Sequence, residues 1–308
     1  MSHNSAMPSD QAKELRRIVE RHKQKNKNLG NLKTFTILSG KGGVGKSNLT
    51  LSLACALAEE KKKIVLMDAD LGLANLDMLC GITSRYNLSH LIDGSRGLDE
   101  VLAPMEENIW VLPGGSGVKE LADLDERRLV ELIDNIALLE NRADVLLVDT
   151  GGGIHKSVLA FAAAADTVIL VTTPEPTAIR DAYGILKALK NSAERNEKRD
   201  IVFIVNMANS EKEGFEVANR LRMAANQFLG LSISYIGCVL RDHFVEQAVR
   251  MRKPFYRLFP NSPSAKCIRS ITEMLASDVP RNGIIGVNQP RGLKAFFYSL
   301  ARGYFNGR

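Results

Sequence analysis

The sequence is poor in the residues that cross-link small secreted proteins or build metal centres. Its 308 residues include only 4 cysteines, 5 histidines and 1 tryptophan. The cysteines lie far apart in the chain, and none forms a C-x-x-C or C-x-C pair; they are Cys55, Cys80, Cys238 and Cys267. This spacing argues against a disulfide framework and against zinc or iron–sulfur ligation by paired cysteines.

Long apolar runs are also missing. No uninterrupted stretch is long enough to cross a bilayer, and the polar N-terminus lacks the apolar segment of a signal peptide. Hydrophobic residues still make up 45% of the chain, which is enough for one large α/β core. The sequence therefore predicts a cytoplasmic globular protein.

A glycine-rich segment between a predicted strand and a predicted helix is the strongest functional signal. The strand covers residues 34–38, the helix covers residues 48–60, and residues 40–47 between them fit G-x-x-x-x-G-K-[ST]. The N–H groups of such a loop and the positive end of the helix dipole bind phosphate. The motif predicts that Lys46 contacts the β- and γ-phosphates and that the Ser47 hydroxyl contacts Mg²⁺. The full set of predicted loop contacts is Gly40, Lys41, Gly42, Gly43, Val44, Gly45, Lys46, Ser47 and Asn48.

Strand-like and helix-like segments alternate along the chain, which predicts a doubly wound, mostly parallel α/β sheet. Further strands are expected at 64–67, 109–112, 145–148, 167–171, 201–205 and 234–240. Amphipathic helices are expected at 127–139, 176–190 and 212–228. Ligands of such sheets bind beyond the carboxyl ends of the strands, so polar residues at strand ends are site candidates.

Three strand ends carry such residues. Asp68 and Asp70 follow the strand at 64–67, and a carboxylate beside a γ-phosphate can orient water and accept its proton. Asp149 follows the candidate strand at 145–148, where it can hold Mg²⁺ through water. Asn206 follows residues 201–205, and its amide matches the donor and acceptor of adenine, which favours ATP over GTP. A turn-forming asparagine is the alternative interpretation.

Two segments of the sequence resemble the MinD/ParA class of deviant Walker A ATPases, which have a P-loop NTPase fold. They are K-G-G-V-G-K-S at 41–47 and D-A-D-L-G-L-A-N-L-D at 68–77, and the second is similar to the MinD branch. The resemblance implies an ATP-dependent homodimer in which Lys41 reaches the partner's nucleotide, with Asp70 as the catalytic carboxylate and Asp68 beside the metal. The alternatives are a solvated charge at Lys41 and an acidic, helix-capping turn at 68–77.

The resemblance implies further nucleotide contacts. The amide of Gly153 is expected to sense the γ-phosphate, and Arg241 and Asp242 lie where the family has its second base-contacting loop. The MinD pattern D-x-x-A-G-I has alanine where this chain has Gly152, so a more mobile loop is expected before nucleotide binds.

The N-terminal segment narrows the resemblance. Asp10, Gln11, Ala12, Leu15 and Arg16 form D-Q-A-x-x-L-R, which ahead of a MinD-like core resembles the flagellar branch of the class (FlhG, also called FleN or YlxH). In that branch the motif docks onto the GTPase FlhF, and the proteins set the number and placement of flagella. Flagellar switch proteins or a flagellar transcription regulator are further candidate partners. A frayed basic tail is the alternative.

The C-terminal segment predicts an amphipathic helix. Residues 280–290 have linker composition, and within 292–308 Phe296, Phe297 and Leu300 share one face. Such a face with basic flanks suits an anionic membrane, whereas packing on the protein's own surface is the alternative, and a nucleotide switch could use both states in turn. The predicted organisation is a partner-binding helix and basic linker at 1–30, an ATPase domain at 31–279, and a linker with a membrane-targeting helix at 280–308. The expected location is the inner face of the cell membrane, and a cell pole is one expected position on it.

Charge alone leaves a competing interpretation. The net charge is +6, and the stretch from Arg16 to Lys33 is almost free of acids after Glu20. A ParA-type partition ATPase that binds DNA nonspecifically would also be basic. We find no helix-turn-helix signature, so specific DNA binding is not expected, and residues 68–77 favour the MinD branch. A nucleotide-binding scaffold that hardly hydrolyses is the remaining alternative.

Overall fold

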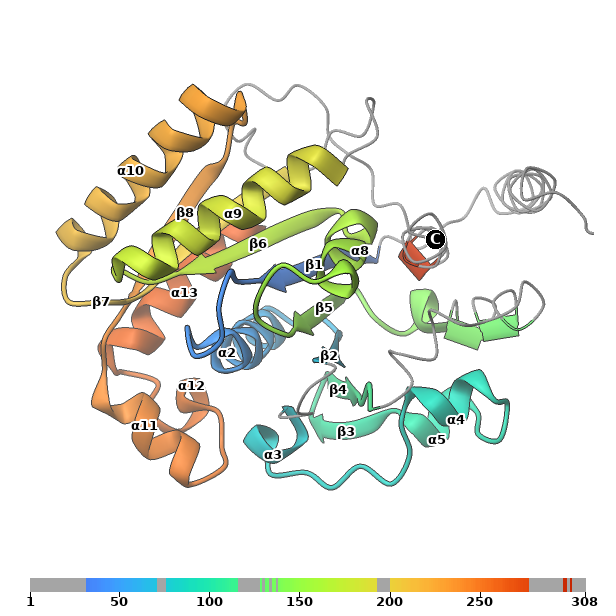
Figure 1. Ribbon diagram of the computed structural model, residues 1–308. Coiled ribbons are helices and arrows are strands. Elements are labelled where there is room, and N and C mark those ends of the chain that lie inside the picture. The colour runs from blue at the N-terminus through green and yellow to red at the C-terminus, as the bar shows by residue number, and fades with distance from the viewer. Residues whose placement is uncertain are drawn as a thin grey trace, which may run out of the picture.

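The chain folds into three layers, with a β-sheet between two layers of helices (Figure 1). The computed structural model describes residues 32–70, 76–115, 138–192 and 200–276, with residues 128, 131, 132, 135, 136, 296, 297 and 300. Within these residues the sheet has 8 strands in the order β3-β4-β2-β5-β1-β6-β7-β8. The strands are β1 Lys33–Leu38, β2 Ile64–Ala69, β3 Ala103–Glu106, β4 Ile109–Leu112, β5 Val145–Thr150, β6 Thr167–Thr172, β7 Asp200–Ala208 and β8 Ser234–Leu240.

The central strands are parallel and buried on both faces. Strands β2, β5 and β6 have no exposed residue, as their continuous apolar sequences predict. Among the described strands only β3 is antiparallel to its neighbour, β4. The parallel arrangement brings the carboxyl ends of β1, β2, β5 and β7 to one edge of the sheet, where a ligand can be bound.

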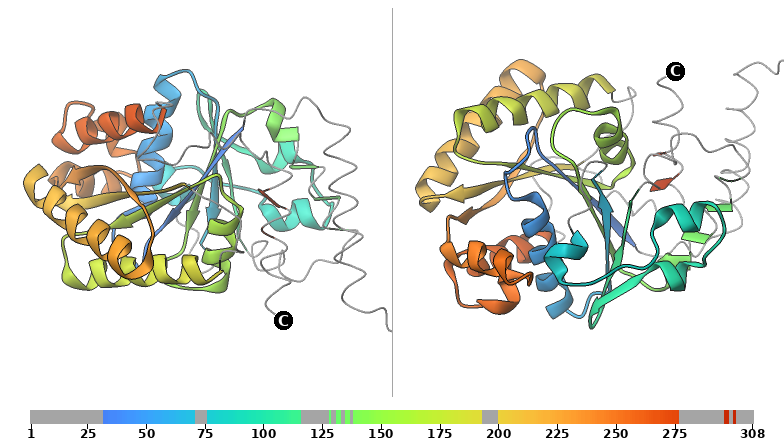
Figure 2. Two further views of the ribbon diagram at one scale, coloured as in Figure 1. Left: turned by 90° about the horizontal axis from the view of Figure 1, so that it is seen from above. Right: turned by 60° about the horizontal axis from the view of Figure 1, so that its bottom comes forward.

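Helices cover both faces of the sheet, as the view from above shows (Figure 2). One apolar cluster joins residues of α2, α3, α11, α12 and α13 to one face, and two others join α4, α5, α8, α9 and α10 to the opposite face. The helices are α2 Lys46–Glu59, α3 Leu76–Cys80, α4 Leu88–Ile92, α5 Leu98–Val101, α8 Lys156–Ala164, α9 Pro176–Ser192, α10 Glu211–Leu229, α11 His243–Arg250, α12 Phe255–Leu258 and α13 Pro263–Ala276. A 3₁₀ turn, η1, spans Leu138–Asn141.

Local signals explain where the longest helix begins and ends. The side chain of Ser210 accepts a hydrogen bond from the N–H of Glu213 at 3.1 Å and caps α10. Gly230 ends it with a φ of 61°, a conformation that glycine adopts without strain. These caps fix α10 beside β7 and β8 at the sheet edge.

Most predicted elements agree with the structure to within three residues at each end. The short edge strand β3 was missed, and the helix predicted at 127–139 lies largely outside the described residues. Its described members Leu132 and Ile136 are helical and buried, and its end belongs to η1.

The described residues of the C-terminal segment lie in the core. Phe296, Phe297 and Leu300 are 0%, 2% and 1% exposed and belong to the cluster beneath α4, α5 and α8. The ring of Phe296 lies 6.2 Å from that of Phe161 in α8. The structure thus has the docked arrangement, which was the alternative to membrane insertion. The motif at 10–16 and the predicted linker at 280–290 lie outside the described residues, among which no helix is long and apolar enough to cross a bilayer.

Candidate functional site

The glycine-rich loop connects β1 to α2 at the carboxyl edge of the sheet. Gly43 and Gly45 have φ values of 78° and 84°, and α2 begins directly after Gly45. A Cβ atom on Gly45 would lie 2.4 Å from Nδ2 of Asn206 in β7. Glycine is therefore required there both by the left-handed backbone and by the close approach of a neighbouring strand.

Hydrogen bonds hold the loop against two other strand ends. Asn206 donates from Nδ2 to the carbonyl of Val44 at 2.8 Å, and the Ser39 hydroxyl donates to the carbonyl of Lys41 at 2.7 Å. The N–H of Gly153 donates to the carbonyl of Ser39 at 2.9 Å. The amide predicted to sense the γ-phosphate is thus engaged by the loop itself, so that contact would need the segment after β5 to move.

Gly152 packs directly on the phosphate loop. A Cβ atom at this position would lie 2.6 Å from the nitrogen of Gly42 and 2.7 Å from the carbonyl carbon of Lys41. These are backbone atoms, which cannot swing aside as a side chain can. The glycine therefore permits close contact between two loops, while the mobility expected from the sequence stays a prediction.

A carboxylate, a hydroxyl and an ammonium group converge beneath the loop. Asp149 in β5 is buried, accepts a hydrogen bond from Oγ1 of Thr50 at 3.4 Å, and lies near Ser47 and the buried Lys46. Burial raises the pKa of Asp149 to about 7, against the opposing effects of Ser47 and Lys46. A buried carboxylate beside a hydroxyl is a donor set that suits Mg²⁺, whose charge would also favour the ionised carboxylate. Bound there, the metal would neutralise charge on the nucleotide phosphates.

The acidic pair at the carboxyl end of β2 lies at the same edge. Asp68 is opposite Asp149 in the parallel register, and it is buried. Its Oδ1 accepts the N–H of Asp70 at 3.1 Å, and its Oδ2 accepts the N–H of Leu76 at 3.2 Å. Asp68 thus accepts the first N–H of α3, as the capping alternative expects.

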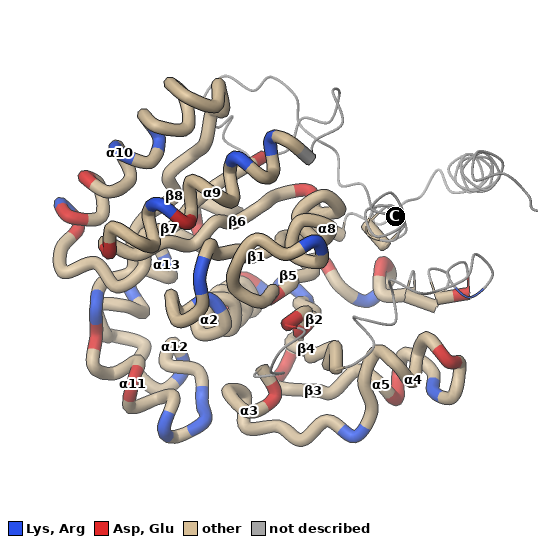
Figure 3. The backbone as a smooth tube through the Cα atoms, viewed as in Figure 1, with Lys and Arg blue, Asp and Glu red and all other residues tan. Residues whose placement is uncertain are grey.

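Asp70 lies beside the segment that follows β5. Its Oδ1 is 3.0 Å from where a Cβ of Gly151 would be. Figure 3 shows the basic loop before α2 and the acidic end of β2 at one edge of the sheet. The fold therefore gathers the predicted catalytic carboxylate, the phosphate loop and the predicted metal ligands at one place.

Lys41 contacts residues that the sequence interpretation had not assigned. Its Nζ forms an ion pair with Glu175 and donates to Oγ1 of Thr177 at 3.2 Å. The hydrogen bond from Lys41, and then its charge, lower the pKa of the exposed Glu175 carboxyl. Glu175 lies just before α9, and Thr177 lies in its first turn.

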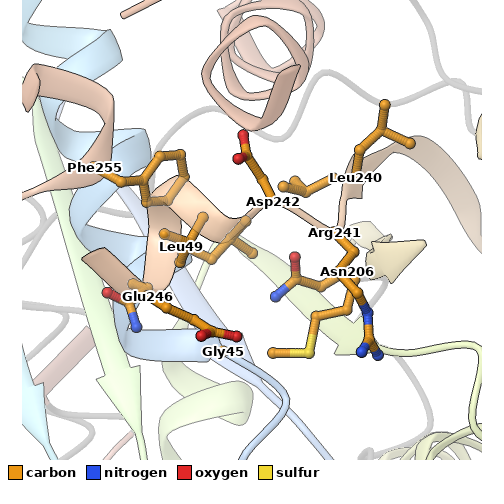
Figure 4. Close-up of a pocket in the computed structure, with 12 residues that line it drawn as sticks. Gly45, Leu49, Asn206, Leu240, Arg241, Asp242, Glu246 and Phe255 are labelled. Atoms are coloured by element: carbon orange, nitrogen blue, oxygen red, sulfur yellow. The ribbon is translucent and has the colours of Figure 1, made fainter. Parts of the chain in front are cut away.

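A cavity of about 150 Å³ lies next to the loop on the side of β7 and β8. It is lined in part by Asn48, Asn206, Arg241, Glu246 and Phe255. Figure 4 shows the last four of these around one space. The structure thus places five of the predicted nucleotide contacts around a single cavity, namely Gly45, Asn48, Asn206, Arg241 and Asp242. Glu246 and Phe255 come from α11 and α12, which carry no sequence motif that could have identified them.

Asp242, which was also predicted to contact the base, is bonded to other parts of the protein. Asp242 lines the cavity, but its Oδ1 accepts the N–H of Phe244 at 3.0 Å and its Oδ2 accepts the hydroxyl of Ser264 at 2.8 Å. Its carboxylate caps α11 and ties that helix to α13. Arg241, by contrast, has its side chain at the cavity and remains a candidate for contact with the nucleotide.

Comparison with known proteins agrees with this geometry. Residues 35–247 match the family model of the CobQ/CobB/MinD/ParA nucleotide binding domain. The chain is 34% identical to the antiactivator FleN of Pseudomonas aeruginosa, over 86% of this chain and 92% of that protein. It is 36% identical to the flagellum site-determining protein YlxH of Helicobacter pylori, over 89% of this chain and 92% of that protein.

A solved structure shares the fold. The MinD cell division protein of Aquifex aeolicus superposes with a TM-score of 0.61 and 26% identity, covering 81% of this chain and 99% of that one. The family match, the two long sequence similarities and the phosphate loop at the sheet edge lead to one assignment. The chain belongs to the MinD/ParA family of P-loop ATPases, in the flagellar branch with FleN and YlxH.

Proposed function

We propose that this ATPase regulates the number and placement of flagella by switching between a monomer and an ATP-bound homodimer at the membrane. The observation that carries the proposal is the similarity to FleN and YlxH over 86% and 89% of the chain, joined to the clustered nucleotide site. YlxH is named as a flagellum site-determining protein and FleN as an antiactivator, and each is covered over 92% of its length. The similarity therefore extends well beyond the nucleotide-binding motif.

Within the site we assign three roles. Asp70 orients the attacking water and accepts its proton late in the reaction, and Asp149 and Ser47 hold Mg²⁺, with Asp68 in the surrounding shell. Asn206 reads the adenine edge. These assignments are supported by the placement of all five residues at one edge of the sheet.

Lys41 is proposed to act in the dimer. It would leave Glu175 and Thr177 of its own chain and reach the nucleotide bound by the partner. A cation delivered at that point would stabilise charge on the transferring phosphoryl group. Because Glu175 is 59% exposed, its ion pair with Lys41 is weak enough to be exchanged for a phosphate contact.

The C-terminal segment is proposed to alternate between the core and the membrane. Phe296, Phe297 and Leu300 are buried in the present arrangement, so a membrane-bound state requires their release. Burying each side chain in the bilayer interface would contribute up to roughly 1.5–3 kcal/mol. Two segments on one dimer would bind together, which can raise avidity about 100-fold or more. ATP-driven dimerisation would thereby favour membrane attachment.

The GTPase FlhF is the proposed partner of the N-terminal motif. The charged and apolar residues of D-Q-A-x-x-L-R would form the contact surface, namely Asp10, Gln11, Ala12, Leu15 and Arg16. Stimulation of FlhF turnover by the full chain, and its loss in a Gln11→Ala, Leu15→Ala variant, would test this contact. Unchanged stimulation by that variant would remove the motif from the interface.

The experiment that tests the proposed switch measures mass and membrane binding together. Light scattering with Mg·ATP should show a dimer for the parent and a monomer for Lys41→Ala, although both bind ATP because Lys46 and the loop remain. Sedimentation with anionic vesicles should follow the dimer. A control variant, Lys62→Ala, alters an exposed charge away from the site and should behave as the parent.

The same samples distinguish the DNA-binding alternative. Binding to nonspecific DNA that needs ATP and falls steeply with salt, without vesicle binding, would favour a ParA-type partition ATPase. A Lys41→Ala protein that dimerises like the parent would contradict the role given to that lysine.

A further inference from the structure

A second cavity lies away from the nucleotide site, at the amino ends of β2 and β4. Its volume is about 390 Å³, within the range of sites that hold small molecules. It is lined by Lys63, Val65, Asp99, Leu102, Pro104, Trp110, Leu139, Asn141 and Arg142. Asp68 lies near the opposite end of β2, five residues from Lys63 or roughly 16 Å along the strand, and Asp70 follows it. A ligand here would not overlap with a nucleotide on the phosphate loop.

The cavity has an aromatic wall built by the strand register. Trp110 pairs with Val65 on one side and with Pro104 on the other, so the three side chains lie in a row on one face of the sheet. Leu102 and Leu139 add apolar surface from the end of α5 and from η1. Trp110 is only partly buried, so part of the indole is accessible to a ligand. A flat aromatic ring can stack on such a surface.

The side chains that line the rim of the cavity include two cations, Lys63 and Arg142. Arg142 is paired with Asp99, with its second guanidinium nitrogen 3.1 Å from Oδ2 of that carboxylate. Lys63 is exposed, and among the described residues no carboxylate lies within ion-pair distance of its ammonium group. The charged residues that line the cavity are thus two cations and one carboxylate, and nearby the carboxylate of Asp144 accepts the backbone N–H of Lys63 at 2.8 Å. The side chain of Asn141 adds a donor and an acceptor.

We propose that this cavity binds a small anionic ligand that carries a flat heteroaromatic ring, of the mononucleotide class, at the same time as ATP occupies the phosphate loop. The ring stacks on Trp110 between Val65 and Pro104, and the phosphate lies beside Lys63. The carboxylate of Asp99 and the amide of Asn141 are the groups available to the polar edge of the ring. This site is separate from the ATPase reaction and does not depend on the flagellar role.

The protein carries its own reporter for this site, because Trp110 is its single tryptophan. The full chain is saturated with Mg·ADP and titrated with GMP, whose base is poorly suited to the adenine site. We expect a saturable change in Trp110 fluorescence, with radiolabelled ADP retained in equilibrium dialysis. Guanosine and inorganic phosphate, tested separately, should each bind at least about tenfold more weakly, since each lacks one of the two contacts.

Matched lysine variants test the charge contact. Lys63→Gln should weaken GMP binding about tenfold, the loss expected for one charge-assisted hydrogen bond. Lys62→Gln, which changes an exposed neighbouring cation outside the cavity, should bind as the parent does. Calorimetry of GMP binding to Trp110→Phe gives a second measurement, made without the indole. Circular dichroism checks that this variant is folded. No fluorescence change up to millimolar GMP, equal affinity of Lys63→Gln and parent, or displacement of ADP by GMP would each overturn the proposal.

Discussion

Replacing Phe296 with alanine should destabilise the whole protein, although this residue lies close to the C-terminus. Its side chain is 0% exposed, its ring lies 5.2 Å from that of Phe297, and its other aromatic neighbour is Phe161 in α8. Truncating a buried phenylalanine costs about 3–5 kcal/mol when the surroundings stay in place. A terminal segment can instead leave the core. The stability lost in Phe296→Ala therefore cannot exceed the free energy that holds the segment in the core.

We therefore expect the lower end of that range, about 3 kcal/mol for Phe296→Ala. At about 2 °C of Tm per kcal/mol in a chain of this size, calorimetry should show a decrease of about 6 °C. The control is Phe228→Ala, because Phe228 is 66% exposed on α10 and its loss should change stability by less than about 0.5 kcal/mol. Equal Tm values for the two variants would refute the docked position of the segment.

A double-mutant cycle locates the contact. Phe161→Ala and Phe296→Ala remove the two members of one ring pair, so their effects should not add. We expect a coupling of about 0.5–1.5 kcal/mol, as for other aromatic pairs in contact. Additive losses would place the segment on another part of the surface.

Three further predictions concern the site and its support. Asn206→Ala removes the 2.8 Å hydrogen bond to Val44 and the proposed adenine contact. Calorimetry should therefore show that ATP affinity falls about tenfold and GTP affinity falls less. An equal loss of affinity for the two nucleotides would contradict recognition of the base by Asn206. Gly45→Ala should lower both the Tm and the affinity for ATP. The control is Gly94→Ala, which measures backbone strain alone, because Gly94 has a φ of 73° but no atom within 4 Å of an added Cβ. An equal decrease in Tm for the two variants would show that the contact of Gly45 with β7 is unimportant. Arg257→Ala loses bonds to two carboxylates and to one backbone carbonyl, so urea unfolding should show a loss of about 1–3 kcal/mol, and no loss would mean that water replaces them.

The parallel core could be predicted because each of its segments carries a local signal. Continuous apolar runs mark β2, β5 and β6, and glycines with a following lysine and serine mark the phosphate loop. Strand β3, with the sequence Ala-Pro-Met-Glu, has neither an apolar run nor strict alternation, and it forms a strand by pairing with β4 at the sheet edge. Its existence depends on a neighbour, which periodicity alone does not reveal.

The site residues, too, could be predicted only where a local sequence signal marks them. Asp149 and Asp70 were predictable because they follow recognisable strands. Glu175 and Glu246 reach the site from loops and helices distant in the sequence, and no motif connects them to it. Asp242 was expected at the base, but its capping of α11 and its bond to Ser264 depend on the packing of α13, which the sequence interpretation did not include.

The most direct test of the account follows phosphate release and molar mass in one solution of Mg·ATP. The parent should hydrolyse ATP and return to a monomer, whereas Asp70→Ala should bind ATP, release phosphate at least about 100-fold more slowly, and remain a dimer. Glu107→Ala, which changes an exposed turn carboxylate away from the site, should match the parent. Phosphate release by Asp70→Ala at the parent rate would contradict the assignment of Asp70 and, with it, the proposed ATP-driven switch.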